Sequence, residues 1–319
     1  MAGVAEATAA APKGAAASTP AIHTVELTKR FGGTVALAGL SMTVPRGEVF
    51  GFLGPNGAGK TTAVKLLLGL LTPTSGEAWL LGQPIGDLST RRRIGYLPEL
   101  FRYQGWLSAR EVLMLHCELA PLPRSRWKEA VDGALHIVDL ADRANHRVGT
   151  FSKGMQQRLG LGAALLGAPE LVFLDEPTSA LDPVGRHDVR RIIRDLAARG
   201  TTVFLNSHLL SEVEQVCDRV AVVDHGRVIA SGTMNELLSG YAVRVRVAGL
   251  TAADLAKITD FGPLDEEGEQ LTFTKLSPDR APDLVAQLVS LGGRVYEVVP
   301  RHQNLEDRFL QLLHEDERS

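Results

Sequence analysis

The stretch Gly54-Pro55-Asn56-Gly57-Ala58-Gly59-Lys60-Thr61-Thr62 decides the fold of this chain. It has the spacing of glycines, lysine and threonine that wraps a backbone around a polyphosphate. The apolar run Glu48–Leu53 before it predicts a strand, and the pattern Thr61–Leu71 after it predicts a helix. Glycines let the loop curl so that its N–H groups face the phosphates, and the helix N-terminus adds positive potential there. We therefore expect a phosphate-binding loop (the P-loop, residues 54–62) between a buried strand and a helix.

Each residue type in the P-loop suits a nucleotide. Lys60 has the length to reach the β- and γ-phosphates and to act in catalysis, and the Thr61 hydroxyl is a ligand for Mg²⁺. The other reading is a chance glycine-rich turn, which the flanking strand and helix patterns disfavour. The residues predicted to hold the nucleotide here are Gly54, Pro55, Asn56, Gly57, Ala58, Gly59, Lys60, Thr61 and Thr62.

A pair of carboxylates predicts the second half of the site. Leu171–Leu174 is a run of four apolar residues, and Asp175 and Glu176 follow it directly. Sites in α/β proteins lie at the carboxyl ends of the strands. Asp175 is therefore expected to hold Mg²⁺, directly or through water, and Glu176 to orient or deprotonate an attacking water. The other reading is an ordinary acidic pair between a strand and a loop, which the presence of the P-loop disfavours.

Strand and helix patterns alternate through residues 60–240, which predicts an α/β domain with a largely parallel core sheet. The stretch from about Tyr96 to Val148 has no buried strand pattern, so we expect a helical subdomain over residues 96–148. Further strands are expected at Ile22–Thr28, Leu40–Val44, Thr201–Asn206 and Val220–Asp224.

The two ends of the chain differ from this central part. Residues 1–21 contain ten alanines and no basic, apolar leader pattern, which predicts a disordered tail with order beginning at Ile22. Residues 241–319 alternate strands and helices again, which predicts a small α+β domain. If Phe261–Glu266 is a strand, the order is βαββαβ, as in ferredoxin-like folds. Asn304 is expected to cap a final helix.

Charge and composition exclude several classes of protein. The chain has 319 residues and a net charge of −3. Residues 241–319 hold 9 Lys and Arg against 14 Asp and Glu. We therefore expect no nucleic-acid partner. The longest uncharged run, Phe31 to Pro45, is too short to span a bilayer. Two distant cysteines, Cys117 and Cys217, fit a reducing cytosol.

These motifs, in this order, resemble the nucleotide-binding subunits of ABC transporters over about Ile22 to Leu238. Asp175 and Glu176 stand at the family's Walker B aspartate and catalytic glutamate. Phe31 stands where the family has an aromatic that stacks on adenine. The remaining matches are the signature segment Phe151–Arg158, the D-loop Pro177–Pro183, and the switch sequence Asn206-Ser207-His208.

The resemblance implies a head-to-tail dimer of ATPase subunits. ATP bound at Lys60 of one subunit is covered by Ser152 and Gly154 of the other, and Asp182 also belongs to the nucleotide site. His208 is expected to contact the γ-phosphate and to help hold Glu176 and the water. Independently of the resemblance, Ser152 and Gly154 precede a helix, and a hydroxyl beside a helix N-terminus is a second anion site. We expect a homodimer, although two different ATPase subunits would also satisfy the pattern.

Three positions depart from the commonest family pattern. Glu99 stands where a glutamine usually helps to hold Mg²⁺ and water, and a carboxylate is also a metal ligand. Lys153 and Met155 replace a glycine and a glutamine of the signature. These variants, and the closing segment Asn304–Leu310, resemble one branch: ATPases of drug, antibiotic, lipid or polysaccharide exporters whose membrane subunit is a separate chain.

The resemblance implies an Mg-dependent ATP hydrolase bound peripherally at the cytoplasmic face of the cell membrane, where it powers a separate permease. In the family the permease contacts the segment after Glu99, about Leu100 to Leu115. Its aromatic residues form either a partner patch or the core of the helical subdomain. These aromatic residues are Phe101, Tyr103 and Trp106.

The alternative function is a soluble ABC-type ATPase acting on ribosomes or DNA. Separately, the run of three arginines at residues 91–93 is expected to be a solvated helix face.

Overall fold

The computed structural model describes residues 19–120, 122–179, 181–238, 241–274, 276–302 and 304–316. Most of the predicted tail, residues 1–18, lies outside these ranges. Ala21 is fully buried, and its N–H donates to the Val44 carbonyl at 2.9 Å. Order therefore begins before Ile22, because the backbone of Ala21 already extends the pairing of the first two strands.

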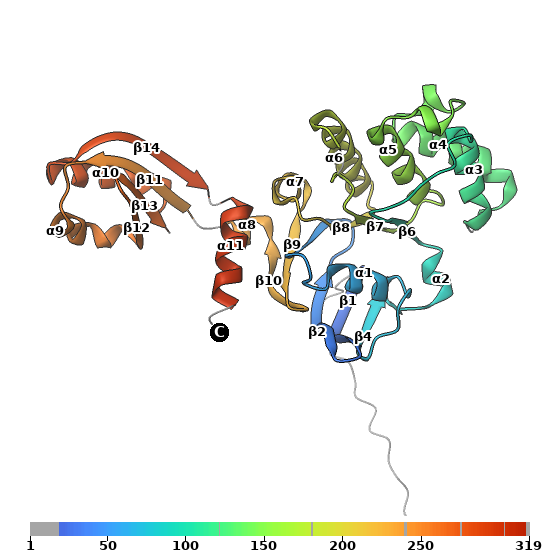
Figure 1. Cartoon of the computed structure of the whole chain (residues 1–319), viewed down its shortest axis with the longest axis horizontal. Helices are drawn as coiled ribbons and strands as arrows, with labels where there is room; N and C mark the ends of the chain where they lie inside the picture. Colours follow the sequence, from blue (N-terminus) through green and yellow to red (C-terminus); the bar gives the residue numbers. More distant parts are fainter. Residues whose placement is uncertain are drawn as a thin grey trace, which may run out of the picture.

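The core is a six-stranded sheet in the order β10-β9-β3-β8-β7-β6 (Figure 1). The pairs β9/β3, β3/β8, β8/β7 and β7/β6 are parallel, and β10 pairs antiparallel with β9. Every residue of β3, β7 and β8 is buried, as expected of strands covered on both faces. The predicted α/β fold is confirmed. The strands are β3 (Val49–Leu53), β6 (Ile94–Leu97), β7 (Leu171–Asp175), β8 (Thr202–Asn206), β9 (Arg219–Asp224) and β10 (Arg227–Thr233).

A second, antiparallel sheet has the order β2-β1-β4-β5. One hydrophobic cluster joins residues of this sheet, of helix α1 (Lys60–Leu67) and of the core sheet, so α1 packs between the two sheets. This packing holds the N-terminus of α1 at the end of β3. The strands are β1 (Ile22–Phe31), β2 (Thr34–Val44), β4 (Ser75–Leu80) and β5 (Gln83–Pro84).

The helical subdomain is formed mainly by α3 (Ala109–Leu119), α4 (Trp127–Ile137) and α5 (Lys153–Ala164), which pack on one another. The expected range 96–148 differs from the structure at both ends. Tyr96 and Leu97 belong to β6, a four-residue strand that contains Gly95 and is too short to give a clear pattern. At the other end, α5 completes the helical core. Outside the helical subdomain, the other helices before residue 238 are α2 (Leu88–Arg91), α6 (Pro183–Ala198), α7 (Leu210–Val216) and α8 (Met234–Leu237).

The C-terminal part has the βαββαβ order, with an antiparallel sheet β12-β13-β11-β14. This order is that of ferredoxin-like folds, which the sequence predicts if a strand lies near Phe261. The strand is β12 (Leu264–Glu267), and Phe261 instead ends a 3₁₀ helix (Ala256–Phe261) that packs against the sheet. The other elements are β11 (Tyr241–Ala248), α9 (Ala252–Leu255), β13 (Gln270–Thr274), α10 (Ala281–Ser290) and β14 (Arg294–His302).

Among the described residues, the last helix, α11 (Leu305–Asp316), has its main contacts outside this C-terminal sheet. It contacts α7 and β10, and Leu305 is buried in the same cluster as the core-sheet residues (Figure 1). The Leu305 N–H also donates to Glu214 Oε2 of α7 at 3.0 Å. The described residues of 241–316 therefore do not form one packed unit, because α11 contacts α7 and β10. The predicted cap is present: Asn304 Oδ1 accepts from the Asp307 N–H at 2.7 Å.

None of the helices in the described ranges has the length and apolar character needed to cross a membrane.

Candidate functional site

The P-loop runs from the end of β3 to the start of α1. Gly57 and Gly59 have φ angles of 87° and 97°, in the left-handed region that favours glycine. A Cβ atom on Gly59 would lie 2.3 Å from the Ala36 carbonyl oxygen, and one on Gly54 would lie 2.2 Å from that of Val223. The glycines at 54 and 59 are thus required by close backbone contacts, and Gly57 by its backbone angle alone.

The N-terminus of α1 is free to bind an anion. No side chain caps it, and its first turn holds no acidic residue. The N–H groups of a first turn have no partner within the helix and carry positive potential. Of the predicted nucleotide-binding residues, Ala58 is buried, Pro55 and Thr62 are half-buried, and Asn56, Gly57 and Thr61 are exposed.

Lys60 supplies a buried positive charge beside this helix end. Its side chain is 8% exposed, and Nζ donates to the carbonyls of Gly54 at 2.7 Å and Pro55 at 3.0 Å. Burial lowers the pKa of Lys60, while the negative charges of Glu176 and Asp175 act in the opposite direction. Lys60 and the two carboxylates therefore share one electrostatic site.

Asp175 lies at the carboxyl end of β7, directly opposite Asn206 of β8. Asn206 Nδ2 donates to Asp175 Oδ1 at 2.5 Å, and Asn206 Oδ1 is buried without a partner among the described residues. Burial raises the pKa of Asp175; the hydrogen bond from Asn206 lowers it, and the charge of Glu99 raises it further. A buried carboxylate near a second carboxylate, with an unsatisfied amide oxygen, favours a bound cation.

The donor set at this edge fits Mg²⁺, which prefers oxygen ligands and keeps several waters. The carboxylates of Asp175 and Glu99 act on each other electrostatically, and the Thr61 hydroxyl is exposed in the first turn of α1. The partnerless Asn206 Oδ1 adds a buried oxygen acceptor beside Asp175.

Glu176 is held in one orientation by the switch segment. It has a φ of 51°, rare for a residue with a side chain, and its own N–H donates to the Asn206 carbonyl at 2.8 Å. Glu176 Oε1 accepts from the His208 N–H at 3.0 Å and lies 2.8 Å from His208 Nδ1. The Ser207 hydroxyl donates to Oε2 at 3.5 Å. The imidazole of His208 is about half-exposed, so its free edge faces solvent.

The signature segment and the D-loop lie together in a separate place. Ser152 caps α5 by accepting from the Met155 N–H at 3.2 Å, and Asp182 caps α6 by accepting from the Gly185 N–H at 2.8 Å. Both residues line one open hollow with Gly154. Among the described residues, the lining of this hollow includes none of the P-loop. One chain therefore carries two separate candidate sites.

Phe31 ends β1, and its side chain is 48% exposed. Lys29 Nζ lies 5.0 Å from the centroid of its ring. An exposed ring beside a cation is available to stack on a planar base.

The aromatic residues after Glu99 divide between the two expected roles. Phe101 and Tyr103, with ring centroids 5.2 Å apart, pack against the helical core. Burial raises the pKa of Tyr103 to about 12. Trp106 is 72% exposed and Leu100 is 87% exposed. Phe101 and Tyr103 thus anchor the segment, and Leu100 and Trp106 are free for a partner.

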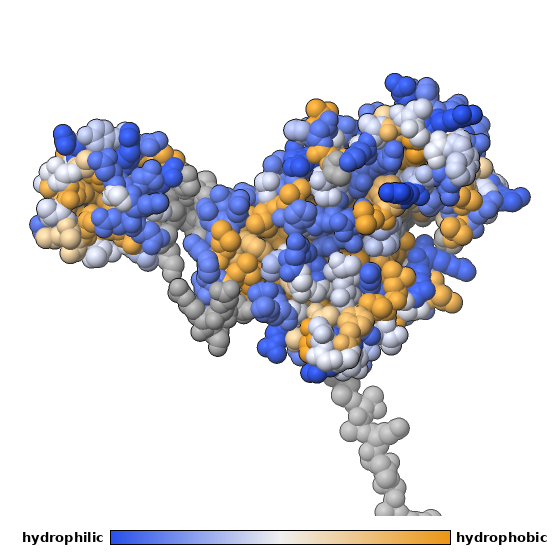
Figure 2. All heavy atoms as spheres, viewed as in Figure 1, coloured by the Kyte–Doolittle hydropathy of each residue, from blue (hydrophilic) through white to orange (hydrophobic). Residues whose placement is uncertain are grey.

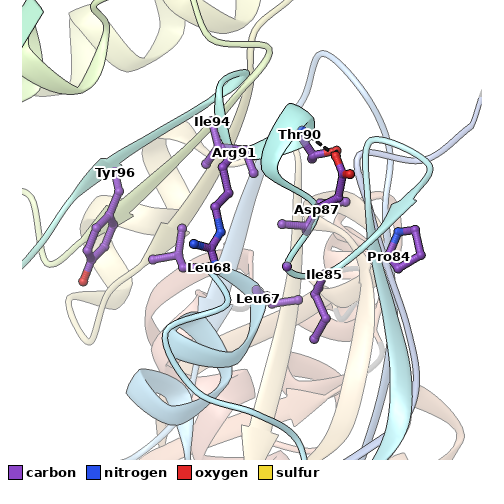
Figure 3. A pocket seen from close by; sticks show the side chains of 11 residues that line it. Leu67, Leu68, Pro84, Ile85, Asp87, Thr90, Arg91, Ile94 and Tyr96 are labelled. Atoms are coloured by element: carbon purple, nitrogen blue, oxygen red, sulfur yellow. Dashed lines mark hydrogen bonds between the residues drawn. The ribbon is translucent and has the colours of Figure 1, made fainter. Parts of the chain in front are cut away.

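A groove of about 500 Å³ lies beside this segment, between β6, α3 and α5. Arg91, Arg92 and Arg102 line it, together with exposed Leu115 and Leu119 of α3. A neighbouring pocket of about 110 Å³ shares Arg91, Ile94 and Tyr96 with it, and Figure 3 shows Arg91 reaching from α2 toward Leu68.

The prediction that the three arginines at residues 91–93 lie on a solvated helix face is wrong in part. Arg91 Nη2 donates to the Gly69 carbonyl at 2.9 Å, and Arg93 forms a two-point ion pair with Glu170. The run also extends from the last residue of α2 to the residue before the core strand β6, rather than lying on one helix.

Two residues of the site were not expected from the sequence, Asn206 and Ser207. They were noted only as neighbours of His208. Their position at the carboxyl end of a buried strand, next to the strand that carries Asp175, is the signal that indicates them.

Comparison with known proteins agrees with this geometry. The profile of the family described as "ABC transporter" matches residues 37–179. The chain is 35% identical to the Nod factor export ATP-binding protein I of Rhizobium sp. (strain N33), over 92% of this chain and 97% of that protein. This chain belongs to the ABC transporter ATP-binding proteins. It is an ATP hydrolase of the ABC type, as the resemblance implied.

Two further similarities support the family. The daunorubicin resistance ATP-binding protein DrrA3 of Streptomyces coeruleorubidus is 39% identical, over 91% of this chain and 95% of that protein. A solved ATP-binding subunit of an ABC transporter superposes with a TM-score of 0.62 at 29% identity, and covers 69% of this chain and 92% of that one. The ABC ATPase therefore shares its fold with solved ATPase subunits.

Proposed function

We propose that this ABC ATPase powers export through a separate integral-membrane permease, bound at the cytoplasmic face of the cell membrane. Two relatives support the direction of transport: one is named for Nod factor export and the other for daunorubicin resistance. Because their named substrates differ, we assign substrate selectivity to the permease. The observation that supports the proposal is the separation of two features in one chain: the P-loop with its neighbouring carboxylates, and the open hollow at Ser152.

In the proposed nucleotide site, the P-loop N–H groups and Lys60 bind the phosphates of ATP, and Phe31 stacks on adenine. Thr61, Asp175 and Glu99 hold Mg²⁺, which neutralises phosphate charge when bound. Asn206 fixes Asp175 by the hydrogen bond already described. The buried cation of Lys60 stabilises charge that develops on the γ-phosphoryl group.

Glu176 acts on the attacking water in this proposal. A carboxylate that accepts hydrogen bonds from the switch segment is pre-aligned, which favours orientation of the water and acceptance of its proton. His208, whose free edge faces solvent, contacts the γ-phosphate. The unfavourable backbone conformation of Glu176, held by these hydrogen bonds, is typical of a catalytic position.

Ser152, which is exposed, and Gly154, which is half-buried, complete the site of a second subunit. The hollow that they form with Asp182 faces solvent and is open to a partner. A twofold, head-to-tail pair places each such hollow over the P-loop of the other subunit, with two ATP molecules between them. ATP binding then closes the pair, and hydrolysis reopens it.

The closing step is testable with Glu176→Gln. The variant keeps the size of the side chain and removes the carboxylate, so ATP should bind and stay unhydrolysed. With Mg-ATP, light scattering should show a dimer for Glu176→Gln and a monomer when Ser152→Arg is added, because the arginine blocks the hollow. A Glu176→Gln protein that hydrolyses ATP as fast as the parent, or remains monomeric, would remove this mechanism.

The groove beside α3 is the proposed docking site for the permease. Its lining combines three arginines with exposed leucines, and among the described residues it contains no carboxylate. A matching segment is therefore amphipathic, with apolar side chains and nearby acidic groups. Trp106 and Leu100 extend the apolar surface next to this groove.

A further inference from the structure

A buried ion cluster connects two helices behind the hydrolytic site. Glu212 lies in the first turn of α7, four residues after His208, and is 6% exposed. Arg190 of α6 donates from Nη1 to both oxygens of Glu212, at 2.9 and 2.8 Å, and its own side chain is 17% exposed. The helices α6 and α7 begin just after the D-loop and just after the switch segment, respectively.

Arg186 extends this cluster to the D-loop. Its Nε donates to the Leu181 carbonyl at 3.1 Å, and its Nη1 lies 3.9 Å from Glu212 Oε1. Leu181 is buried and directly precedes Asp182, the cap of α6. One guanidinium therefore contacts both the D-loop backbone and the carboxylate of α7.

The same end of α7 leads to the catalytic carboxylate. One residue, Leu209, separates His208 from the start of α7, and the His208 N–H donates to Glu176. A displacement of α7 relative to α6 would therefore move the group that orients Glu176. The continuous path runs from the Leu181 carbonyl through Arg186 and Glu212 to the switch segment.

Stability alone does not account for this arrangement. Taking charges out of water costs several kcal/mol per ion, and replacing a buried pair by apolar side chains is often neutral or stabilising. The best-attested use of such pairs is to fix one relative placement of two elements. The rigid, planar fork of arginine suits that role, since it fixes two acceptors at once.

We propose that Arg186, Arg190 and Glu212 are positioning residues for ATP hydrolysis, which hold the D-loop and the switch segment in one mutual placement. This rests on the proposed roles of Glu176 and His208. Within the described part of the chain, no hydrogen bond or ion pair joins these three residues to the P-loop, so we expect ATP binding to be independent of them. They act by keeping His208 and Glu176 aligned with the water, and a small misalignment lowers the rate of the chemical step.

The test compares Arg186→Gln with the parent in the full chain. Arg186→Gln should lower kcat about tenfold, with the KM and the dissociation constant for ATP changed less than about twofold. Arg186→Lys, which keeps the charge but can satisfy only one acceptor well, should restore part of kcat. Arg191→Gln is the matched control, because Arg191 lies on the same helix in an exposed pair with Asp195; it should leave kcat unchanged.

A double-mutant cycle then asks whether the residues act through one path. Glu212→Gln and Arg186→Gln should each slow hydrolysis, and the double variant should be no slower than Glu212→Gln alone. In a His208→Ala background, Arg186→Gln should add less than about a twofold loss. If Glu212→Gln does not fold, the Arg186 and His208 variants still complete the test.

The outcomes separate this inference from the proposed function. If Glu176→Gln and His208→Ala fail to slow hydrolysis, the proposed catalytic roles are wrong. If those variants are slow but Arg186→Gln keeps the parental kcat, only the positioning role is overturned. A lower thermal midpoint with unchanged kcat, or parallel losses of ATP affinity and kcat, would also overturn it, since a purely structural role predicts those results.

Discussion

At the scale of single residues, the site depends on charges that burial makes sensitive to their neighbours. Lys60 and Asp175 are both shifted by burial, in opposite directions, toward their neutral forms. The positive charge at the P-loop and the negative charge at the metal edge therefore stabilise each other. Loss of either one should weaken the function of the other.

This predicts an unusual alkaline dependence of ATP binding. Because burial lowers the pKa of Lys60 below the ordinary lysine value, its ammonium loses its proton earlier as pH rises, and nucleotide affinity falls with it. A titration with a fluorescent ATP analogue from about pH 7 to about pH 10 measures this. Lys60→Arg stays charged throughout, so its affinity should not fall in that range. Parallel curves for the two proteins would show that another group controls binding.

At the scale of elements, the backbone of the P-loop is fixed by contacts with neighbouring strands. Gly59 lies against the Ala36 carbonyl of β2, whereas the Cβ position of Gly57 is open. Both glycines have left-handed backbone angles, so a side chain at either position would be strained. The two positions differ only in the contact with the Ala36 carbonyl.

This difference gives a matched pair of substitutions. Gly57→Ala should cost about 1–2 kcal/mol from strain. Gly59→Ala should cost about 3 kcal/mol or more, because the added methyl group also displaces β2 from the loop. Urea unfolding of the two variants measures the difference. Equal losses would mean that the β2 contact does not constrain the P-loop.

The elements most predictable from sequence are those whose burial is total. The strands β7, β8 and β9 lie within one residue of their predicted limits, since continuous apolar runs between turn signals leave little choice. The strand β6 was not predicted because four residues with a central glycine carry too little pattern. The sequence predicts the P-loop, Asp175 and Glu176 because their chemistry requires particular residue types at fixed spacing, whereas only the family resemblance indicates His208.

What could not be predicted is which surfaces meet. The pattern of α11 shows an apolar face, but periodicity does not say what covers it, and the structure places it on α7. The pairing of Arg190 with Glu212 joins residues 22 positions apart on different helices. Phe101 and Trp106 look alike in sequence, and only the packing shows that Phe101 is anchored and Trp106 exposed.

At the scale of the whole molecule, the chain leaves the ATPase part, forms the C-terminal sheet and returns. Hydrophobic residues are visible over α7, β9 and β10 on the face shown in Figure 2, next to α11. Leu305 and Phe309 pack into the core cluster there. The return of α11 therefore closes part of the hydrophobic surface of the ATPase part.

This predicts different effects for two leucines of α11. Leu305→Ala should weaken the docking of α11 by about 2–3 kcal/mol, because Leu305 is fully buried. Leu310→Ala, at a position 50% exposed, should cost about 0.5 kcal/mol or less. Hydrogen exchange of α7 and α11 reports the docking directly. If α7 and α11 are equally protected from hydrogen exchange in the two variants, this role of α11 is contradicted.

The exposed surface after Glu99 carries the prediction for coupling. Trp106→Glu should abolish transport and leave ATP binding within about twofold of the parent, because a charge is placed in the proposed permease contact. Val289→Glu, at an exposed position of α10, is the control and should leave transport unchanged. Transport that continues at the parental rate in Trp106→Glu would exclude this surface as the contact.

The most direct measurement is purification of the tagged chain from gently solubilised membranes, with quantitative mass spectrometry of the bound proteins. The account predicts a polytopic membrane protein in stoichiometric amount, reduced in the Trp106→Glu variant. Recovery of the chain alone, or bound to ribosomes or DNA, would leave its ATPase chemistry intact and contradict its role in transport.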